Sequence, residues 1–97
     1  MMDIHATVLD LLSQTGIMEY PILRSLRNLF ARPDYPMEHQ KGICAYPDWR
    51  VRAALADETT HPGILDIIAQ DRDGWVRRIV ARRNITSHAT LISLSKD

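Results

Sequence analysis

The chain has 97 residues, which is enough for one domain and too few for two, because two halves would each bury too little surface to be stable. Its composition, 45% hydrophobic and 25% charged, is that of an ordinary globular protein and argues against disorder, a collagen-like structure and membrane insertion. The 12 Lys and Arg residues balance the 12 Asp and Glu residues, so no overall charge attracts the protein to nucleic acid or anionic lipid.

The first residues predict a helix rather than a secretion signal. Asp3 is an acid where a secretion signal carries positive charge, and the apolar run stops at Leu12. We therefore expect a cytoplasmic protein whose residues 1–16 form an N-terminal capping helix, ended by Thr15 and Gly16. The apolar face of this helix consists of Ile4, Val8, Leu11 and Leu12.

A six-residue pattern recurs along the rest of the chain. The order apolar, Arg, variable, apolar, apolar, Ala is found at residues 26–31, 51–56 and 76–81, an interval of 25 residues (76 minus 51). The chain is therefore interpreted as a single helical-repeat domain, 1–97, with the third repeat holding one inserted residue. The repeats are 22–46, 47–71 and 72–97.

Each repeat is predicted to begin with an α-helix. Apolar residues at i, i+3 and i+4 after Val51 and Val76 indicate helices over 47–57 and 73–83, each beginning within about two residues of Asp48 or Asp73. The repeat register also predicts which side chains are buried together. They are Leu29, Ile43, Val51, Ala54, Leu55, Ile68, Val76, Ile79, Val80 and Leu94.

A second short helical element follows in each repeat, at about 36–45, 62–70 and 87–94. Thr60 or Ser87 could cap it, and proline near its start suits a first helical turn, where no N–H is needed. No segment alternates with period two over more than a few residues, so strands find no support. The predicted fold class is all-α.

Residues 64–84, ILDIIAQDRDGWVRRIVARRN, resemble a unit of the leucine-rich repeat variant family, roughly L-x-x-L-A-x-D-x-D-x-x-V-R-x-x-V-A-x-N. The similarity is close over 47–97, weaker over 22–46 and absent over 1–16. The resemblance implies a short right-handed solenoid of alternating α and 3-10 helices, and little about function, because such repeats are a scaffold. HEAT and armadillo units are the nearest alternative, but they run to about 40 residues or more.

Three arginines occupy one register of the repeat: Arg27, Arg52 and Arg77. In a stack they would form a ladder that could bind anions. The structural interpretation is favoured, because Asp48 and Asp73 each precede an arginine of this set by four residues, the better order for an ion pair within a helix.

The candidate partner-binding residues lie in the third repeat. Between Asp73 and Asp97 the sequence has no acid, and its basic cluster could bind phosphates or an acidic protein surface, or be simply a solvated helix face. Trp49 and Trp75 are expected to be buried between repeats, the alternative being exposed interface anchors. The candidate set is Arg72, Trp75, Arg78, Arg82 and Arg83, with Arg77 in the same cluster.

The sequence offers no pattern typical of a catalytic or metal site. The histidines, His5, His39, His61 and His88, share neither repeat register nor helical spacing, and Cys44 is a lone cysteine expected in the core. We therefore expect no metal, no cofactor and no enzymatic activity. The predicted function is a scaffold for protein–protein interaction, with nucleic-acid binding through residues 72–83 as the alternative.

The end of the third repeat predicts self-association. Since no further helix follows Asp97, we expect the apolar side chains Leu91, Ile92 and Leu94 to remain uncovered and to join two copies about a two-fold axis. Polar neighbours such as Ser93 and Ser95 favour the alternative, a monomer. Sedimentation of the wild type beside the Leu91→Glu, Leu94→Glu double variant tests this, and a monomeric wild type at micromolar concentration refutes it.

Overall fold

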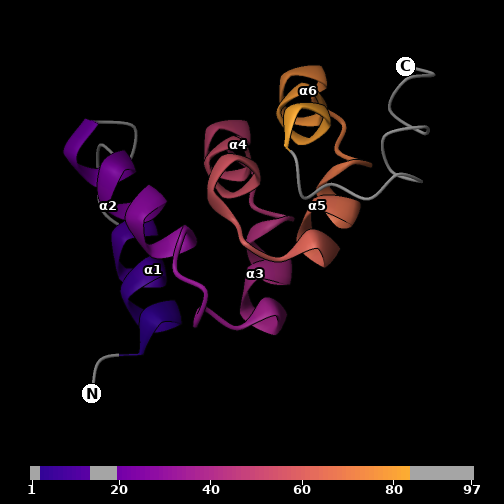
Figure 1. Ribbon diagram of the computed structural model, residues 1–97. Helices are drawn as coiled ribbons and strands as arrows, with labels where there is room; N and C mark the ends of the chain where they lie inside the picture. The colour runs from indigo at the N-terminus through magenta and orange to yellow at the C-terminus, as the bar shows by residue number, and fades with distance from the viewer. Residues whose placement is uncertain (1–2, 14–19, 84–97) are drawn as a thin grey trace.

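The computed structural model describes residues 3–13 and 20–83, and within them the chain forms α-helices and no strand. The all-α prediction is confirmed over these ranges. None of the helices described is long and apolar enough to cross a lipid bilayer. In chain order they are α1 (Ile4–Leu12), α2 (Tyr20–Phe30), α3 (Met37–Ile43), α4 (Trp49–Glu58), α5 (Pro62–Ile68) and α6 (Gly74–Arg82), as Figure 1 shows.

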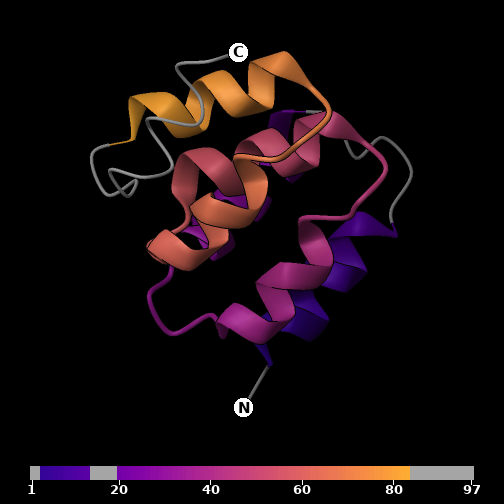
Figure 2. The same ribbon diagram turned by 90° about the vertical axis from the view of Figure 1, so that its right-hand side faces the viewer.

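The helices form two rows. In one row α2, α4 and α6 lie side by side in chain order, and α1, α3 and α5 lie along the other (Figure 1). A view at right angles shows α6 above α5 at one end of the molecule (Figure 2). Since α4 contacts α2, α3, α5 and α6, it is the central helix.

Aspartates fix the first turns of three helices. The Asp48 side chain accepts a hydrogen bond from the backbone N–H of Arg50, and Asp73 accepts from those of Trp75 and Val76. These bonds satisfy N–H groups that have no partner within a helix. Both helices thus begin next to their aspartate, as predicted, and Asp3 caps α1 in the same way.

The core is centred on α4, in which every residue from Val51 to Ala56 is buried. The core prediction is confirmed at most positions but is wrong for Leu29 and Ile79, which are half-buried. They share a register with Ala54, yet α4 has neighbours on both sides, whereas α2 and α6 are each covered by α4 on one side only. Leu94 lies outside the described residues. The confirmed positions are Ile43, Val51, Ala54, Leu55, Ile68, Val76 and Val80.

The second elements of the first two repeats are α-helices, so the 3-10 geometry that the resemblance implied is wrong for α3 and α5. The Ala69 N–H donates to the Leu65 carbonyl at 2.8 Å, a bond between residues four apart. Thr60 does not cap α5: His61 is the N-cap, without a side-chain bond, and Pro62 is the first helical residue. A helix of seven residues, the length of α3 and of α5, is long enough to form hydrogen bonds between residues four apart.

Candidate functional site

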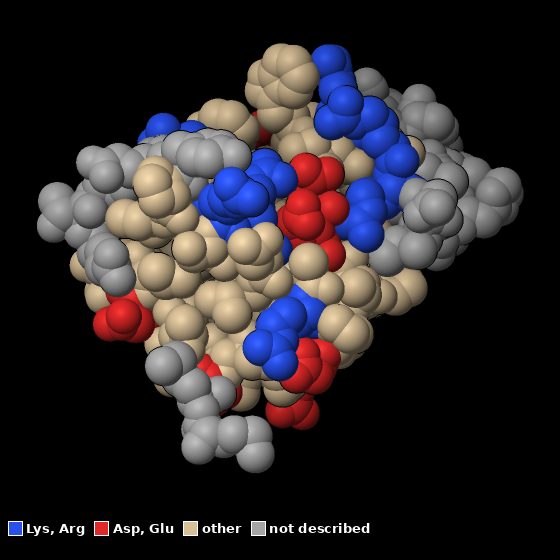
Figure 3. All heavy atoms as spheres, turned by 60° about the vertical axis from the view of Figure 1, so that its left-hand side comes forward, with Lys and Arg blue, Asp and Glu red and all other residues tan. Residues whose placement is uncertain are grey.

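Charged residues of both signs share one face of the molecule. Figure 3 shows acidic groups between two groups of basic ones. Arg27 of α2 pairs with acids of α4, its Nη1 lying 2.8 Å from Asp57 Oδ2 and 3.7 Å from Glu58 Oε1. These partly exposed pairs contribute little stability. Arg27 therefore does not supply a free positive charge.

The outer side of α6 differs, because it combines an exposed aromatic ring with arginines. Trp75 is 61% exposed, and Arg78 and Arg82 are exposed, while Val76 and Val80 are buried in the core. The Arg78 Cζ lies 4.8 Å from the centroid of the Trp75 ring, a cation–π contact. The helix thus presents an indole and two guanidinium groups to solvent.

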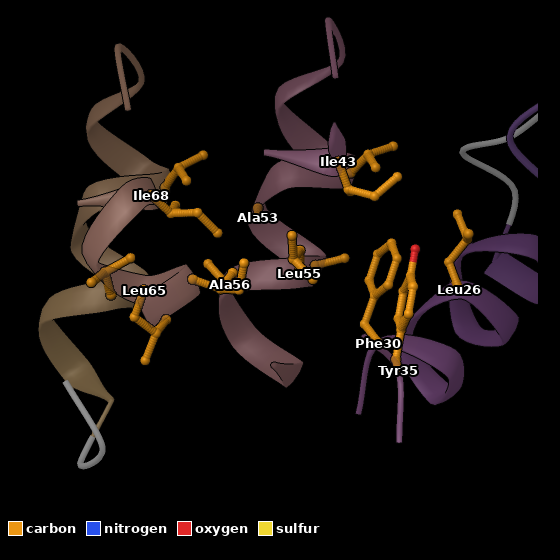
Figure 4. Close-up of a cluster of buried hydrophobic side chains, with 14 of the residues drawn as sticks. Leu26, Phe30, Tyr35, Ile43, Ala53, Leu55, Ala56, Leu65 and Ile68 are labelled. Carbon is orange, nitrogen blue, oxygen red and sulfur yellow. The ribbon is translucent and has the colours of Figure 1, made fainter. Parts of the chain in front are cut away.

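The prediction that the tryptophans fill the space between repeats is wrong, since Trp49 is also exposed, at 42%. The buried stretch of the central helix α4, Val51 to Ala56, includes the small residues Ala53 and Ala56 (Figure 4), and Trp49 precedes this stretch. Each tryptophan instead lies in the first turn of its helix, next to the capping aspartate.

Arg83, also a candidate partner-binding residue, is less exposed than Arg78 and Arg82. Its guanidinium turns back to α4, where Nη1 donates to the Ala56 carbonyl at 2.8 Å and Nη2 to the Thr59 carbonyl at 2.7 Å. Carbonyls at the end of a helix lack internal partners, so Arg83 satisfies groups that would otherwise need water. Its role is structural.

Arg52 forms a buried ion pair that spans two elements. Its Nε donates to Asp71 Oδ2 at 2.7 Å and its Nη2 to Asp71 Oδ1 at 3.2 Å, and the two side chains are only 4% and 5% exposed. The expected pair between Asp48 and Arg52 is therefore wrong. Asp48 bonds Arg50 instead, because the Arg52 side chain is directed into the interior, where a two-point contact with Asp71 is available.

A hydrogen bond from Arg52 to a backbone carbonyl has a counterpart 25 residues later, at Arg77. Arg52 Nη1 donates to the Tyr46 carbonyl at 2.6 Å, and Arg77 Nη1 donates to the Asp71 carbonyl at 2.7 Å. In both cases the acceptor lies six residues before the arginine, and both pairs are 25 residues apart (77 minus 52, 71 minus 46). Arg52 of α4 and Arg77 of α6 thus each bond a carbonyl in the segment that precedes their own helix.

A hollow of about 280 Å³ lies beside the Arg52–Asp71 ion pair, and Cys44 and Arg72 are among the residues that line it. Burial raises the pKa of the Cys44 thiol to about 11, so the thiol is protonated at neutral pH and is a poor nucleophile. The charged groups Arg52 and Asp71 satisfy each other. Arg72 is exposed and makes no hydrogen bond or ion pair with the residues described.

Two histidines that the sequence pattern does not relate, His5 and His39, are in contact. The rings of His5 and His39 stack with centroids 4.3 Å apart, and His5 Nδ1 lies 2.9 Å from the Tyr35 hydroxyl. His61 Nε2 donates to the Tyr35 carbonyl at 3.0 Å. No repeat spacing could have indicated the stack, because it depends on how α1 docks on the other helices. In the described ranges no three metal-binding side chains converge.

Four of the five candidate partner-binding residues are exposed, and they lie within the segment 72–82. His88 and the self-association residues Leu91, Ile92 and Leu94 lie outside the described part of the chain, so that prediction stays open. The surface formed by Arg72, Trp75, Arg78 and Arg82 is called the Arg–Trp surface below. Comparison of the chain with family models, curated proteins and solved structures gives no match.

Proposed function

We propose that the protein is a non-catalytic helical-repeat scaffold that binds an acidic segment of a partner protein through the Arg–Trp surface. The observation that carries this proposal is the exposed Trp75 ring with Arg78 over it at 4.8 Å. Tryptophan and arginine are the residues that most often dominate binding energy at protein interfaces. Exposing a large apolar ring is otherwise unfavourable, and a partner would cover it.

Charge decides the kind of partner. Among the described residues Arg72, Arg78 and Arg82 form no ion pair, and Arg78 lies over the Trp75 ring. A carboxylate-bearing segment supplies the missing counter-charges, and arginine binds carboxylates at two points. An apolar side chain of the same segment would lie on the exposed edge of Trp75.

The architecture we propose for this scaffold is a short right-handed solenoid related to the leucine-rich repeat variant family. The side-by-side order of α2, α4 and α6 supports it, as do the equivalent bonds of Arg52 and Arg77. Stacked helical units present an extended surface to a partner.

Charge reversal at two positions tests the proposed surface. The Arg78→Glu, Arg82→Glu variant should bind a fluorescein-labelled peptide of alternating Glu and Leu at least about tenfold more weakly than the wild type, because each new carboxylate repels the peptide. Its free energy of unfolding should change by less than about 0.5 kcal/mol, since both side chains are exposed. Fluorescence anisotropy and urea unfolding measure the two quantities.

The matched control is the Arg24→Glu, Lys41→Glu variant, which makes the same change in net charge at exposed positions of α2 and α3. It should retain wild-type binding. Equal weakening in both variants, or no binding by the wild type, contradicts the proposal. Tight binding of the wild type to an oligo-dT strand, with a steep loss as salt rises, would assign the surface to nucleic acid instead.

A further inference from the structure

A pair of stacked imidazole rings joins α1 to α3. His5 of α1 and His39 of α3 stack with centroids 4.3 Å apart and an interplanar angle of 20°. Neutral imidazoles stack favourably, whereas two imidazolium ions at this distance repel each other. The state of charge of the pair therefore decides whether the contact is stable.

The surroundings do not compensate for a second positive charge. The buried His39 Nδ1 has no hydrogen-bond partner among the described residues, so a proton added there would have no acceptor. On His5, Nδ1 already faces the Tyr35 hydroxyl at 2.9 Å. Among the described residues, the one acid that acts on the His5 pKa is Asp3, the N-cap of α1, and α2 contributes no charge that shifts it.

We propose that the His5–His39 stack is an acid-sensitive contact that holds α1 on the rest of the protein at neutral pH and releases it when both rings are protonated. Tyr35, in the loop between α2 and α3, and His61, which donates to the Tyr35 carbonyl, remain bonded to each other and to α3. The change is therefore confined to α1.

The pKa of His5 has the sign that this contact requires. Burial, and then the charge of His39, lower it below its ordinary value, while Asp3 opposes them. Because the folded state prefers neutral His5, its contribution to stability is complete above the ordinary pKa of about 6.5 and is lost as pH falls through the lower folded value.

Release of α1 would uncover apolar surface. Val8 is fully buried and belongs to the same core as Leu26 of α2, and Ile4, Leu11 and Leu12 pack against that core. Helix α4 has four other helices around it and does not depend on α1. Acid would thus expose one face of α2 while the central helix keeps its packing.

Amide hydrogen exchange measured by NMR tests the inference on the intact chain. Between about pH 7 and pH 5, after correction for intrinsic rates, protection of the amides of residues 8–12 should fall about tenfold or more, because the folded state prefers neutral His5 and α1 therefore opens more often in acid. Protection in α4 should remain. In His39→Phe the ring stack is kept without the second imidazole, so the loss of protection in α1 should be smaller than in the wild type, burial of His5 being the part that remains.

His61→Gln is the matched control, because it removes a histidine that lies outside the stack and keeps an amide donor for the Tyr35 carbonyl. Its α1 should still open in acid. If His39→Phe does not fold, His5→Gln replaces it, with the same expected decrease in the acid response. The inference is overturned if α1 stays protected at pH 5, if α4 opens together with α1, or if the acid response is undiminished when His39 or His5 is replaced. None of these outcomes depends on the proposed binding function.

Discussion

Replacing Arg52 with alanine should lower the free energy of unfolding by about 3–5 kcal/mol, because it leaves a buried carboxylate without its counter-ion. Asp71 is only 5% exposed and receives two hydrogen bonds from Arg52. The same substitution removes the donor to the carbonyls of Tyr46 and Pro47. For a domain whose total stability is about 5–15 kcal/mol, such a loss places the variant near the limit of folding.

Urea unfolding followed by far-UV circular dichroism measures this effect. Arg50→Ala is the matched control, because Arg50 belongs to the same helix and pairs with Asp48 while remaining 50% exposed. It should cost less than about 1 kcal/mol. A loss of that small size in Arg52→Ala as well would mean that water or another group takes over the charge of Asp71.

Leu55→Ala is expected to cost about 2–5 kcal/mol, the usual range for removing a fully buried leucine side chain. Leu55 is fully buried on the central helix, with Phe30 and Leu65 on opposite sides of α4 (Figure 4). Because α4 contacts helices on both sides, the cavity can close only if the two rows shift together. The value is therefore expected in the upper part of this range.

Thermal unfolding should show the same loss as a fall in Tm of about 4–8 °C for each kcal/mol. The matched control is Leu9→Ala, the same change at a position that is 49% exposed on α1. Its cost should be a small fraction of that at Leu55. Similar losses at the two positions would contradict the central place of α4.

Local patterns were sufficient to predict the helices that begin after Asp48 and Asp73, because a capping side chain and apolar spacing act within a few residues. Local patterns were not sufficient to predict that Trp49 and Trp75 are exposed. The spacing of apolar residues indicates which side of a helix is buried, but whether a side chain in the first turn is covered depends on how the helices pack in three dimensions.

The exposure of the candidate site residues could be predicted only in part, because helical spacing does not reveal tertiary contacts. Trp75, Arg78 and Arg82 are exposed on α6, the prediction for Arg78 and Arg82 following from helical spacing alone. The bonds of Arg83 could not be predicted, because its acceptors, the carbonyls of Ala56 and Thr59 at the end of α4, are distant in sequence and leave no trace in the side-chain pattern. The stack of His5 on His39 likewise depends on tertiary docking.

The bonds that Arg52 and Arg77 make to carbonyls six positions earlier bear on how such a chain can change length. Excising residues 47–71 would join Tyr46 to Arg72 and so place the Tyr46 carbonyl six positions before Arg77, which is the spacing that Arg77 already spans to Asp71. Duplicating the same segment would create another arginine with its acceptor in register. At this bond, therefore, removing or adding the 25-residue segment 47–71 requires no second, compensating substitution.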